Sequence, residues 1–253
     1  MKRVIAVTNQ KGGVGKTTTA VNLAAQLAQP DRRVVLVDMD PQGNATSSLG
    51  IDKEQLPKTL YDVLVGGAQP ADIVLPTSVE NLFVLPANST LAQAEVDLVG
   101  MERREYKLRD VLAHVDAELV LIDCPPALGL LTVNALTAAS DVLIPVQAEY
   151  FALEGLGQLL QTVQLVKQGL NPSLEIMGVV LTMFNKRISL SEQVKAELTQ
   201  HFGPKLFKAV VPRNVRLAEA PSYGRTIFEH DKWSKGARAY KHLGDEVVKR
   251  LGA

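Results

Sequence analysis

The feature that most constrains this chain is a glycine-rich stretch, KGGVGKTT, at residues 11–18. Before it, residues 3–8 (RVIAVT) form an uninterrupted apolar, β-branched run, which predicts a short buried strand. After it, residues 16–28 carry apolar side chains at helical spacing and predict a helix. A strand, a glycine-rich turn and a helix that opens with Lys-Thr form the context in which such a loop predicts phosphate binding.

The physical reason lies in the backbone. Glycines let successive N–H groups point into one concavity, and the first helical turn adds unpaired N–H donors and the positive end of the helix dipole. Lys16 is predicted to reach the β- and γ-phosphates of a nucleoside triphosphate, and the Thr17 hydroxyl to ligate Mg²⁺. The alternative, a flexible turn with a solvated lysine, does not account for the flanking strand and helix. The predicted nucleotide-binding residues are Lys11, Gly12, Gly13, Val14, Gly15, Lys16, Thr17 and Thr18.

The loop departs from the standard pattern at its start. The pattern places a glycine five residues before Gly15, where this chain has Gln10, and Lys11 follows as an additional lysine. A second ammonium group beside the first is unfavourable unless it binds a phosphate. Lys11 therefore either contacts the phosphates of its own subunit or reaches a nucleotide held by another subunit.

Acidic residues follow the second predicted strand, residues 33–38, in the loop DMDPQGN. Ligands of open α/β sheets sit at the carboxyl ends of the strands, and this loop leaves such an end. An acid there can hold Mg²⁺ through water or orient a water that attacks the γ-phosphate. For Asp38 or Asp40 singly, the alternative is a helix cap in front of residues 44–49.

A second strand that ends in an acid lies in the middle of the chain. Residues 119–123 (LVLID) are apolar up to Asp123, and Cys124-Pro125-Pro126 follows. This pattern is typical of a Walker B element, whose acid meets the Mg²⁺ shell. Cys124 is interpreted as a small packed residue rather than a nucleophile, because no histidine lies near it in the sequence.

The remaining pattern alternates strands with helices, which predicts one doubly wound, mostly parallel sheet covered by helices on both faces. Further strands are predicted at residues 82–86, 141–146, 176–183 and 207–211, and helices at residues 60–64, 101–116, 152–167, 190–202 and 235–251. Residues 52–100 are less legible and carry no chemistry that the pattern identifies. Without a break in composition, residues 1–253 are interpreted as a single P-loop ATPase domain.

Composition narrows the class of protein. The chain has 46% hydrophobic and 21% charged residues and a single cysteine, which excludes an internal disulfide. No apolar run approaches 18 residues, and the first strand leaves no room for a signal peptide, so we expect a cytoplasmic protein. The net charge is zero, but residues 186–253 carry 14 basic and seven acidic side chains. That excess either forms a positive face or simply solvates helices.

The motifs together resemble one family, the ParA/Soj chromosome- and plasmid-partitioning ATPases, which belong to a deviant-Walker class with MinD and the nitrogenase iron protein. The resemblance covers essentially the whole chain and is carried by KGGVGKTT, VDMDPQGNAT, LIDCPP, VLTMFNKR and VPRNVRLAEAPSYG. The first motif is specific to the class and the last two to ParA/Soj. The chain resembles the short form, which lacks an N-terminal helix-turn-helix domain.

The resemblance implies a mechanism. Two subunits would sandwich two ATP molecules with Mg²⁺, and Lys11 would reach the nucleotide of the other subunit. Asp40 would position the hydrolytic water, with Asp123 in the outer shell of the Mg²⁺. Pro212 and Asn214 would line the adenine.

The resemblance also implies partners. The ATP-bound homodimer would bind double-stranded DNA without sequence preference, through Arg187 and Arg216, and would be associated with the nucleoid. A ParB-type centromere-binding protein would stimulate the slow ATP hydrolysis and release the DNA. No stable membrane association is expected.

Three alternatives remain open. A MinD-like membrane ATPase would end in a lipid-binding amphipathic helix, but the stripe of Tyr240, Leu243, Val247 and Leu251 favours core packing. A metabolic P-loop enzyme, such as an amidoligase or a carboxylase, would need a substrate pocket that no cluster outside the nucleotide motifs indicates. A nucleotide-gated DNA-binding scaffold shares every motif and differs only in turnover. Electron transfer of the iron-protein kind is excluded, since it needs two cysteines in each subunit.

Overall fold

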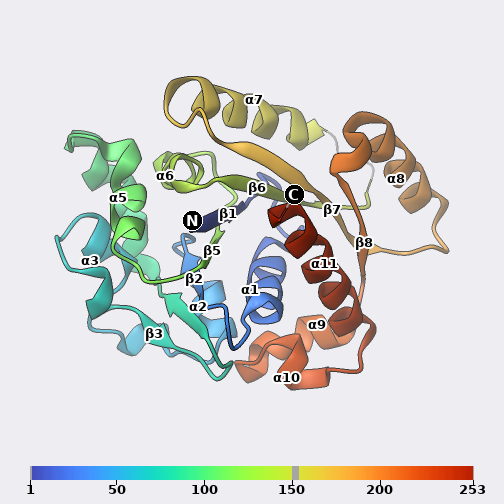
Figure 1. Cartoon of the computed structure of the whole chain (residues 1–253), viewed down its shortest axis with the longest axis horizontal. Helices are drawn as coiled ribbons and strands as arrows, with labels where there is room; N and C mark the ends of the chain where they lie inside the picture. Colours follow the sequence, from blue (N-terminus) through green and yellow to red (C-terminus); the bar gives the residue numbers. More distant parts are fainter. Residues whose placement is uncertain (1, 150–153, 253) are drawn as a thin grey trace.

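The computed structural model describes residues 2–149 and 154–252, and all of its named strands belong to one eight-stranded sheet in the order β3-β4-β2-β5-β1-β6-β7-β8 (Figure 1). The strands are β1 (Arg3–Val7), β2 (Val34–Asp38), β3 (Leu75–Pro76), β4 (Leu82–Leu85), β5 (Leu119–Asp123), β6 (Asp141–Gln147), β7 (Glu175–Phe184) and β8 (Leu206–Pro212). Every pairing is parallel except that of the short edge strand β3 with β4. The predicted doubly wound, mostly parallel fold is confirmed.

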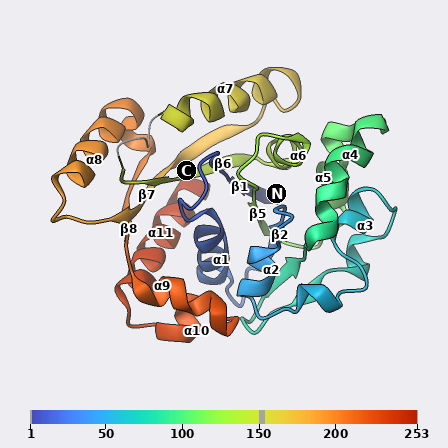
Figure 2. The same cartoon turned by 180° about the vertical axis from the view of Figure 1, so that it is seen from behind.

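Helices cover both faces of the sheet, and this explains why the central strands are apolar throughout. One face packs against α1 (Lys16–Leu27), α2 (Asn44–Ser48), α9 (Val215–Glu219), α10 (Ile227–Asp231) and α11 (Lys235–Leu251). The other packs against α3 (Leu60–Leu64), α4 (Ala94–Asp97), α5 (Lys107–Ala113), α6 (Leu130–Ala138), α7 (Glu154–Gly169) and α8 (Ser189–Phe202). Strands β2 and β5 are buried at every position. Figures 1 and 2 show the two helical layers from opposite sides.

The register of the central strands brings the predicted acids together. In the parallel pairing of β2 with β5, Asp38 is the partner of Asp123, and in that of β1 with β5 the partner of Asp123 is Val7. The carboxyl ends of all three strands therefore lie in one row. The glycine-rich loop leaves β1 at the same edge, so the topology alone places it beside both acids.

Some predicted elements differ from those observed. The predicted helix 101–116 is shorter, because its first part forms a separate turn of 3₁₀-helix and only α5 is α-helical. Helix α6 was not predicted at all. The predicted helix 152–167 corresponds to α7, but residues 152 and 153, with the expected apolar Leu153, lie outside the described residues. No helix in ranges 2–149 and 154–252 is long and apolar enough to cross a membrane.

Candidate functional site

The glycine-rich loop curls between β1 and α1 because two of its glycines adopt backbone angles that other residues avoid. Gly13 has φ 73° and Gly15 has φ 86°, both in the left-handed region. Gly15 is the N-cap of α1, and no side chain caps it. The first helical hydrogen bond runs from Thr19 N to Gly15 O, which leaves the earlier N–H groups of the helix as donors for a ligand. The loop therefore has the donors that a phosphate group requires.

Lys16 lies inside this loop rather than in solvent. The residue is 7% exposed, and its Nζ donates a hydrogen bond to the carbonyl oxygen of Lys11 at 3.2 Å. Burial lowers the pKa of Lys16, while the negative charges of Asp123 and Asp40 oppose that shift. The ammonium group is thus held at the mouth of the loop, close to the acids at the strand ends, where the predicted phosphates would lie.

Asp38 is a positioning group for the loop after β2. Its Oδ2 accepts hydrogen bonds from the N and Oγ1 of Thr46, at 2.8 and 2.7 Å, and its Oδ1 accepts one from Asp40 N at 3.3 Å. Burial raises the pKa of Asp38 to about 6, although these hydrogen bonds oppose the shift. Asp38 is not the N-cap of α2, which is Gly43, but its carboxylate accepts the hydrogen bond of Thr46 N in the first turn of that helix.

Asp40 lies two residues further along, at the end of the row of strands. The residue is 8% exposed, and its Oδ1 accepts a hydrogen bond from Gln42 N at 2.9 Å. The turn is closed by Gly43 N, which donates to the carbonyl oxygen of Asp40 at 2.9 Å. The negative charge of Asp40 also opposes the lowering of the Lys16 pKa, so this carboxylate lies near the ammonium group.

Asp123 is a buried carboxylate at the end of β5. The residue is fully buried, and neither carboxylate oxygen accepts a hydrogen bond of ordinary geometry from the described residues. Burial raises the pKa of Asp123 well above its ordinary value, with a further contribution from Asp38, whereas the Thr17 hydroxyl and the charge of Lys16 oppose the shift. Unsatisfied buried carboxylate oxygens beside a hydroxyl are suitable partners for Mg²⁺ or its waters. The residues present therefore fit the predicted metal.

A cavity of about 220 Å³ opens beside the loop and is suitable for a base. Its walls include both residues predicted to line adenine, Pro212 and Asn214, and the loop residues Gly15 and Thr18. The wall residues that were not predicted include Thr182, Met183 and Tyr240. The first two belong to the VLTMFNKR motif, in which only Arg187 was given a role.

Two hydrogen bonds fix this cavity to the loop. Thr182 Oγ1 donates to the carbonyl oxygen of Val14 at 2.7 Å, and the hydroxyl of Tyr240 lies 3.1 Å from that of Thr19. Met183 has φ 50°, an uncommon angle for a residue with a side chain. The carboxyl end of β7 thus contacts the nucleotide loop, and Tyr240 of α11 forms part of the cavity wall.

The side chain of Lys11 is partly exposed and pairs with an acid. Its Nζ lies 3.4 Å from Glu149 Oε2, and its side chain is 36% exposed. The amide of Lys11 donates to Asn9 Oδ1 at 3.0 Å, while Asn9 Nδ2 donates to the carbonyl oxygen of Pro145 at 2.7 Å. The backbone at Lys11 is therefore anchored to β6, whereas its ammonium group sits at the surface of the loop.

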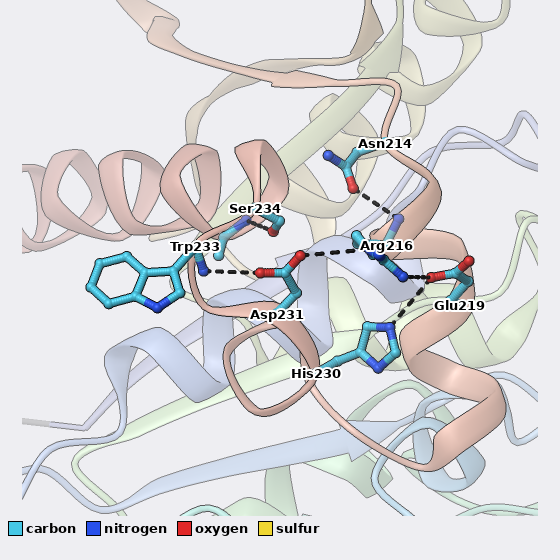
Figure 3. Close-up of polar contacts among 8 residues, drawn as sticks. Asn214, Arg216, Glu219, His230, Asp231, Trp233 and Ser234 are labelled. Atoms are coloured by element: carbon cyan, nitrogen blue, oxygen red, sulfur yellow. Dashed lines mark hydrogen bonds and ion pairs between the residues drawn. The ribbon is translucent and has the colours of Figure 1, made fainter.

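The two arginines predicted to contact DNA have different surroundings. Arg187 is exposed on the loop between β7 and α8. Arg216, on α9, has acidic partners: its Nη1 lies 2.9 Å from Glu219 Oε2 and its Nε 3.6 Å from Asp231 Oδ2 (Figure 3). Glu219 also faces His230, at 3.5 Å. The two arginines therefore lie on different elements, and of the two only Arg216 is paired with acids within residues 2–149 and 154–252.

The interpretation of Cys124 as a packed residue agrees with its position. It is fully buried next to Asp123, and burial raises the pKa of its thiol. A thiol in such surroundings stays protonated and is a poor nucleophile.

Comparison with known proteins gives concordant results. A family model described as an AAA domain matches residues 2–176. The chain is 55% identical to the sporulation initiation inhibitor protein Soj of Bacillus subtilis, over 98% of this chain and 99% of that protein. It is 52% identical to the chromosome partitioning protein ParA of Myxococcus xanthus, over 98% of this chain and 88% of that protein.

One solved structure is similar over the whole chain. It is that of cobyrinic acid a,c-diamide synthase from Mycobacterium smegmatis with bound ADP and magnesium. The TM-score is 0.88 and the identity 39%, over 100% of this chain and 96% of that one. A neighbour with the same fold thus holds a nucleotide and the metal for which the site described above has suitable groups.

Proposed function

The chain belongs to the ParA/Soj family of chromosome-partitioning proteins, and from this premise we propose that it is a DNA-partitioning ATPase that uses ATP and Mg²⁺. Its ATP-bound dimer binds duplex DNA without sequence preference, and a ParB-type centromere-binding protein stimulates hydrolysis and so releases the DNA. The observation that carries the proposal is the nucleotide loop with a buried lysine, Lys16, and a surface lysine, Lys11, beside the acids at the carboxyl ends of two adjacent strands, β2 and β5. We further propose that the 253 residues form one domain, in the cytoplasm and on the nucleoid.

Each group of the site has a separate task in this proposal. Lys16 binds the β- and γ-phosphates of its own nucleotide. Thr17 would hold Mg²⁺, with Asp123 in the outer shell of the metal, and the metal would supply charge neutralisation. Asp40 orients the attacking water. Lys11 binds the nucleotide of the other subunit, and Pro212 and Asn214 contact the adenine.

The direct test is ATP hydrolysis by the purified chain, measured alone, with duplex DNA, with a cognate ParB-type protein, and with both. We expect slow turnover alone and a clear increase only when DNA and partner are both present. Turnover that is fast alone and indifferent to both additions would contradict the proposal. Normal DNA binding without any turnover would instead support the scaffold alternative.

The Asp40→Ala variant separates hydrolysis from binding. A carboxylate that only orients water contributes little to nucleotide affinity, so we expect ATP binding within about threefold of wild type but turnover reduced by about 100-fold or more. The ATP-bound dimer should then persist on DNA. Single-turnover hydrolysis and DNA dissociation kinetics check this, with Glu102→Ala, which removes an exposed carboxylate, as control. Turnover near the wild-type rate would show that Asp40 has been misassigned.

Arg187 and Arg216 are proposed to bind phosphates rather than base edges, so replacing either should weaken binding equally on unrelated duplexes. Each lost phosphate contact flattens the plot of log affinity against log salt by about 0.9, or about two units for a dimer. We expect the larger loss for Arg187→Ala, because Arg216 is already paired with Glu219 and Asp231. Salt titrations on two duplexes, with ATP and with ADP, provide the measurement. Preference for one duplex, or equal binding with ADP, would refute non-specific, ATP-gated binding.

The membrane alternative is disfavoured by the surroundings of the last helix. Tyr240, Leu243 and Val247 of α11 are each at most 1% exposed and belong to the core beneath the sheet. An apolar stripe that is already buried is not free to enter a lipid surface. Co-sedimentation with liposomes in the presence of ATP distinguishes the two functions.

The metabolic alternative takes its support from the name of the structural neighbour, a synthase. That name belongs to the neighbour, and the relatives with identities above 50% include chromosome-partitioning proteins. If the chain were an amidoligase, ATP turnover would depend on a small-molecule acid and an amine donor rather than on DNA and a ParB-type protein. The same ATPase assay with those additions separates the two functions.

A further inference from the structure

A large groove at one end of the sheet is lined almost entirely by basic and apolar side chains. Its volume is about 710 Å³, and it lies between the β7–α8 loop, the end of β8 and the N-terminal half of α11. In both views α8 and α11 flank β7 and β8 at this end (Figures 1 and 2). Its polar wall residues are Asn185, Lys186, Arg187, Arg213, Lys235, Arg238 and His242. We refer to it as the basic groove.

The cations of the basic groove are not neutralised by the chain itself. Within residues 2–149 and 154–252, no acidic side chain approaches Lys186, Arg187, Arg213, Lys235 or Arg238 to within 4.0 Å. No acid lines the groove either. By contrast, Arg216 has two acidic partners and Lys11 has one. Like charges that converge on a cavity repel one another, and an anionic ligand would relieve that repulsion.

The shape of the groove favours a particular anion. Three basic positions of α11, Lys235, Arg238 and His242, follow one another at helical spacing and form a charged row along one wall. The aromatic residue in the wall, Phe184, is 6% exposed and offers no face on which an unpaired base could stack. Charge without a stacking surface suits the phosphate backbone of a duplex rather than a single strand.

We propose that the basic groove binds the phosphate backbone of duplex DNA, and that Arg213, Lys235 and Arg238 bind phosphates there together with Arg187. This inference rests on the proposed function and locates its DNA contacts. Pro212 and Arg213 also line the cavity assigned to adenine, so the two sites of one subunit share a wall. Arg216 lies outside the lining of the groove and contributes a separate, partly neutralised contact.

Arg238→Ala is the first test. Losing one exposed phosphate contact in each of two subunits should weaken duplex binding about two- to thirtyfold at fixed salt. The salt slope should flatten by about two units. Lys235→Ala should act in the same direction, and Arg238→Lys should restore most of the affinity. The matched control is Arg109→Ala, which removes the same group from an exposed position on α5, at the opposite end of the sheet.

Fluorescence anisotropy with a labelled duplex, in ATP, gives the affinities, and ATP binding and thermal melting establish that each variant is folded. If the wild type does not bind the duplex with ATP, the proposed function itself fails. If the wild type binds and both groove variants bind like Arg109→Ala, the groove assignment alone is wrong. It is also wrong if the groove variants retain duplex binding but lose binding to vesicles of anionic phospholipid, because the groove would then serve a membrane surface.

Discussion

Replacing Lys16 by alanine is expected to lower the affinity for ATP by at least about 100-fold and to abolish dimerisation and DNA binding with it. The estimate follows from two charge-assisted hydrogen bonds to phosphates, each contributing about 1.5–3 kcal/mol. The surroundings make the loss larger rather than smaller. Without the ammonium group, the negative charges of Asp40 and Asp123, which now act on Lys16, would repel the triphosphate.

Calorimetric titration with ATP and Mg²⁺ measures this loss, and a second variant separates charge from packing. Lys16→Met keeps most of the buried aliphatic stem, so it should melt close to wild type yet bind ATP as poorly as Lys16→Ala. Because Lys16 is only 7% exposed, the alanine variant also leaves a small void, which thermal melting reports. Micromolar affinity in either variant would remove the basis for a phosphate-binding loop.

The nucleotide site was predictable because its parts are local in sequence. Gly13, Gly15 and Lys16 lie within four residues. The two glycines adopt left-handed backbone angles that few other residues adopt, and Lys16 adds a positive charge to the loop that they form. Alternating strands and helices fixed the sheet as parallel, and parallel strands place their carboxyl ends at one edge. The register of Asp38 opposite Asp123 then follows from topology, although no local pattern contains it.

Other features depend on contacts between distant segments and left no local signal. Helix α6 has apolar residues around most of its circumference, since α5 and α7 cover it and leave no polar face to define a period. Two contacts also join separate segments of the chain: the hydrogen bond from Thr182 to the nucleotide loop and the pairing of Arg216 with Asp231. The unpartnered oxygens of Asp123 likewise depend on what surrounds them in the folded chain. For the charges of residues 186–253, composition left a positive face and solvated helices equally open. The structure separates the residues that line the basic groove from Arg216, which is paired with acids.

Lys11→Ala is expected to give the opposite pattern to Lys16→Ala: ATP binding within about threefold of wild type, but neither an ATP-dependent dimer nor turnover. The reason is position. The ammonium group of Lys11 lies at the surface of the loop beside Glu149 and does not enter the pocket that holds Lys16. Its pairing with Glu149 is half exposed and contributes at most about 1 kcal/mol, so exchange for a triphosphate of another subunit is favourable.

Glu149→Gln is the variant that separates an action across the dimer from a role within one subunit. If Lys11 served only to pair with Glu149, both variants would lose the same ion pair and behave alike. If Lys11 binds the partner's nucleotide, Glu149→Gln leaves the ammonium group free and should dimerise at least as well as wild type, while Lys11→Ala stays monomeric. Sedimentation velocity with a non-hydrolysable ATP analogue, and with ADP as control, measures the difference. A normal analogue-dependent dimer in Lys11→Ala would exclude the action across the dimer, because that variant lacks the ammonium group proposed to bind the partner's nucleotide.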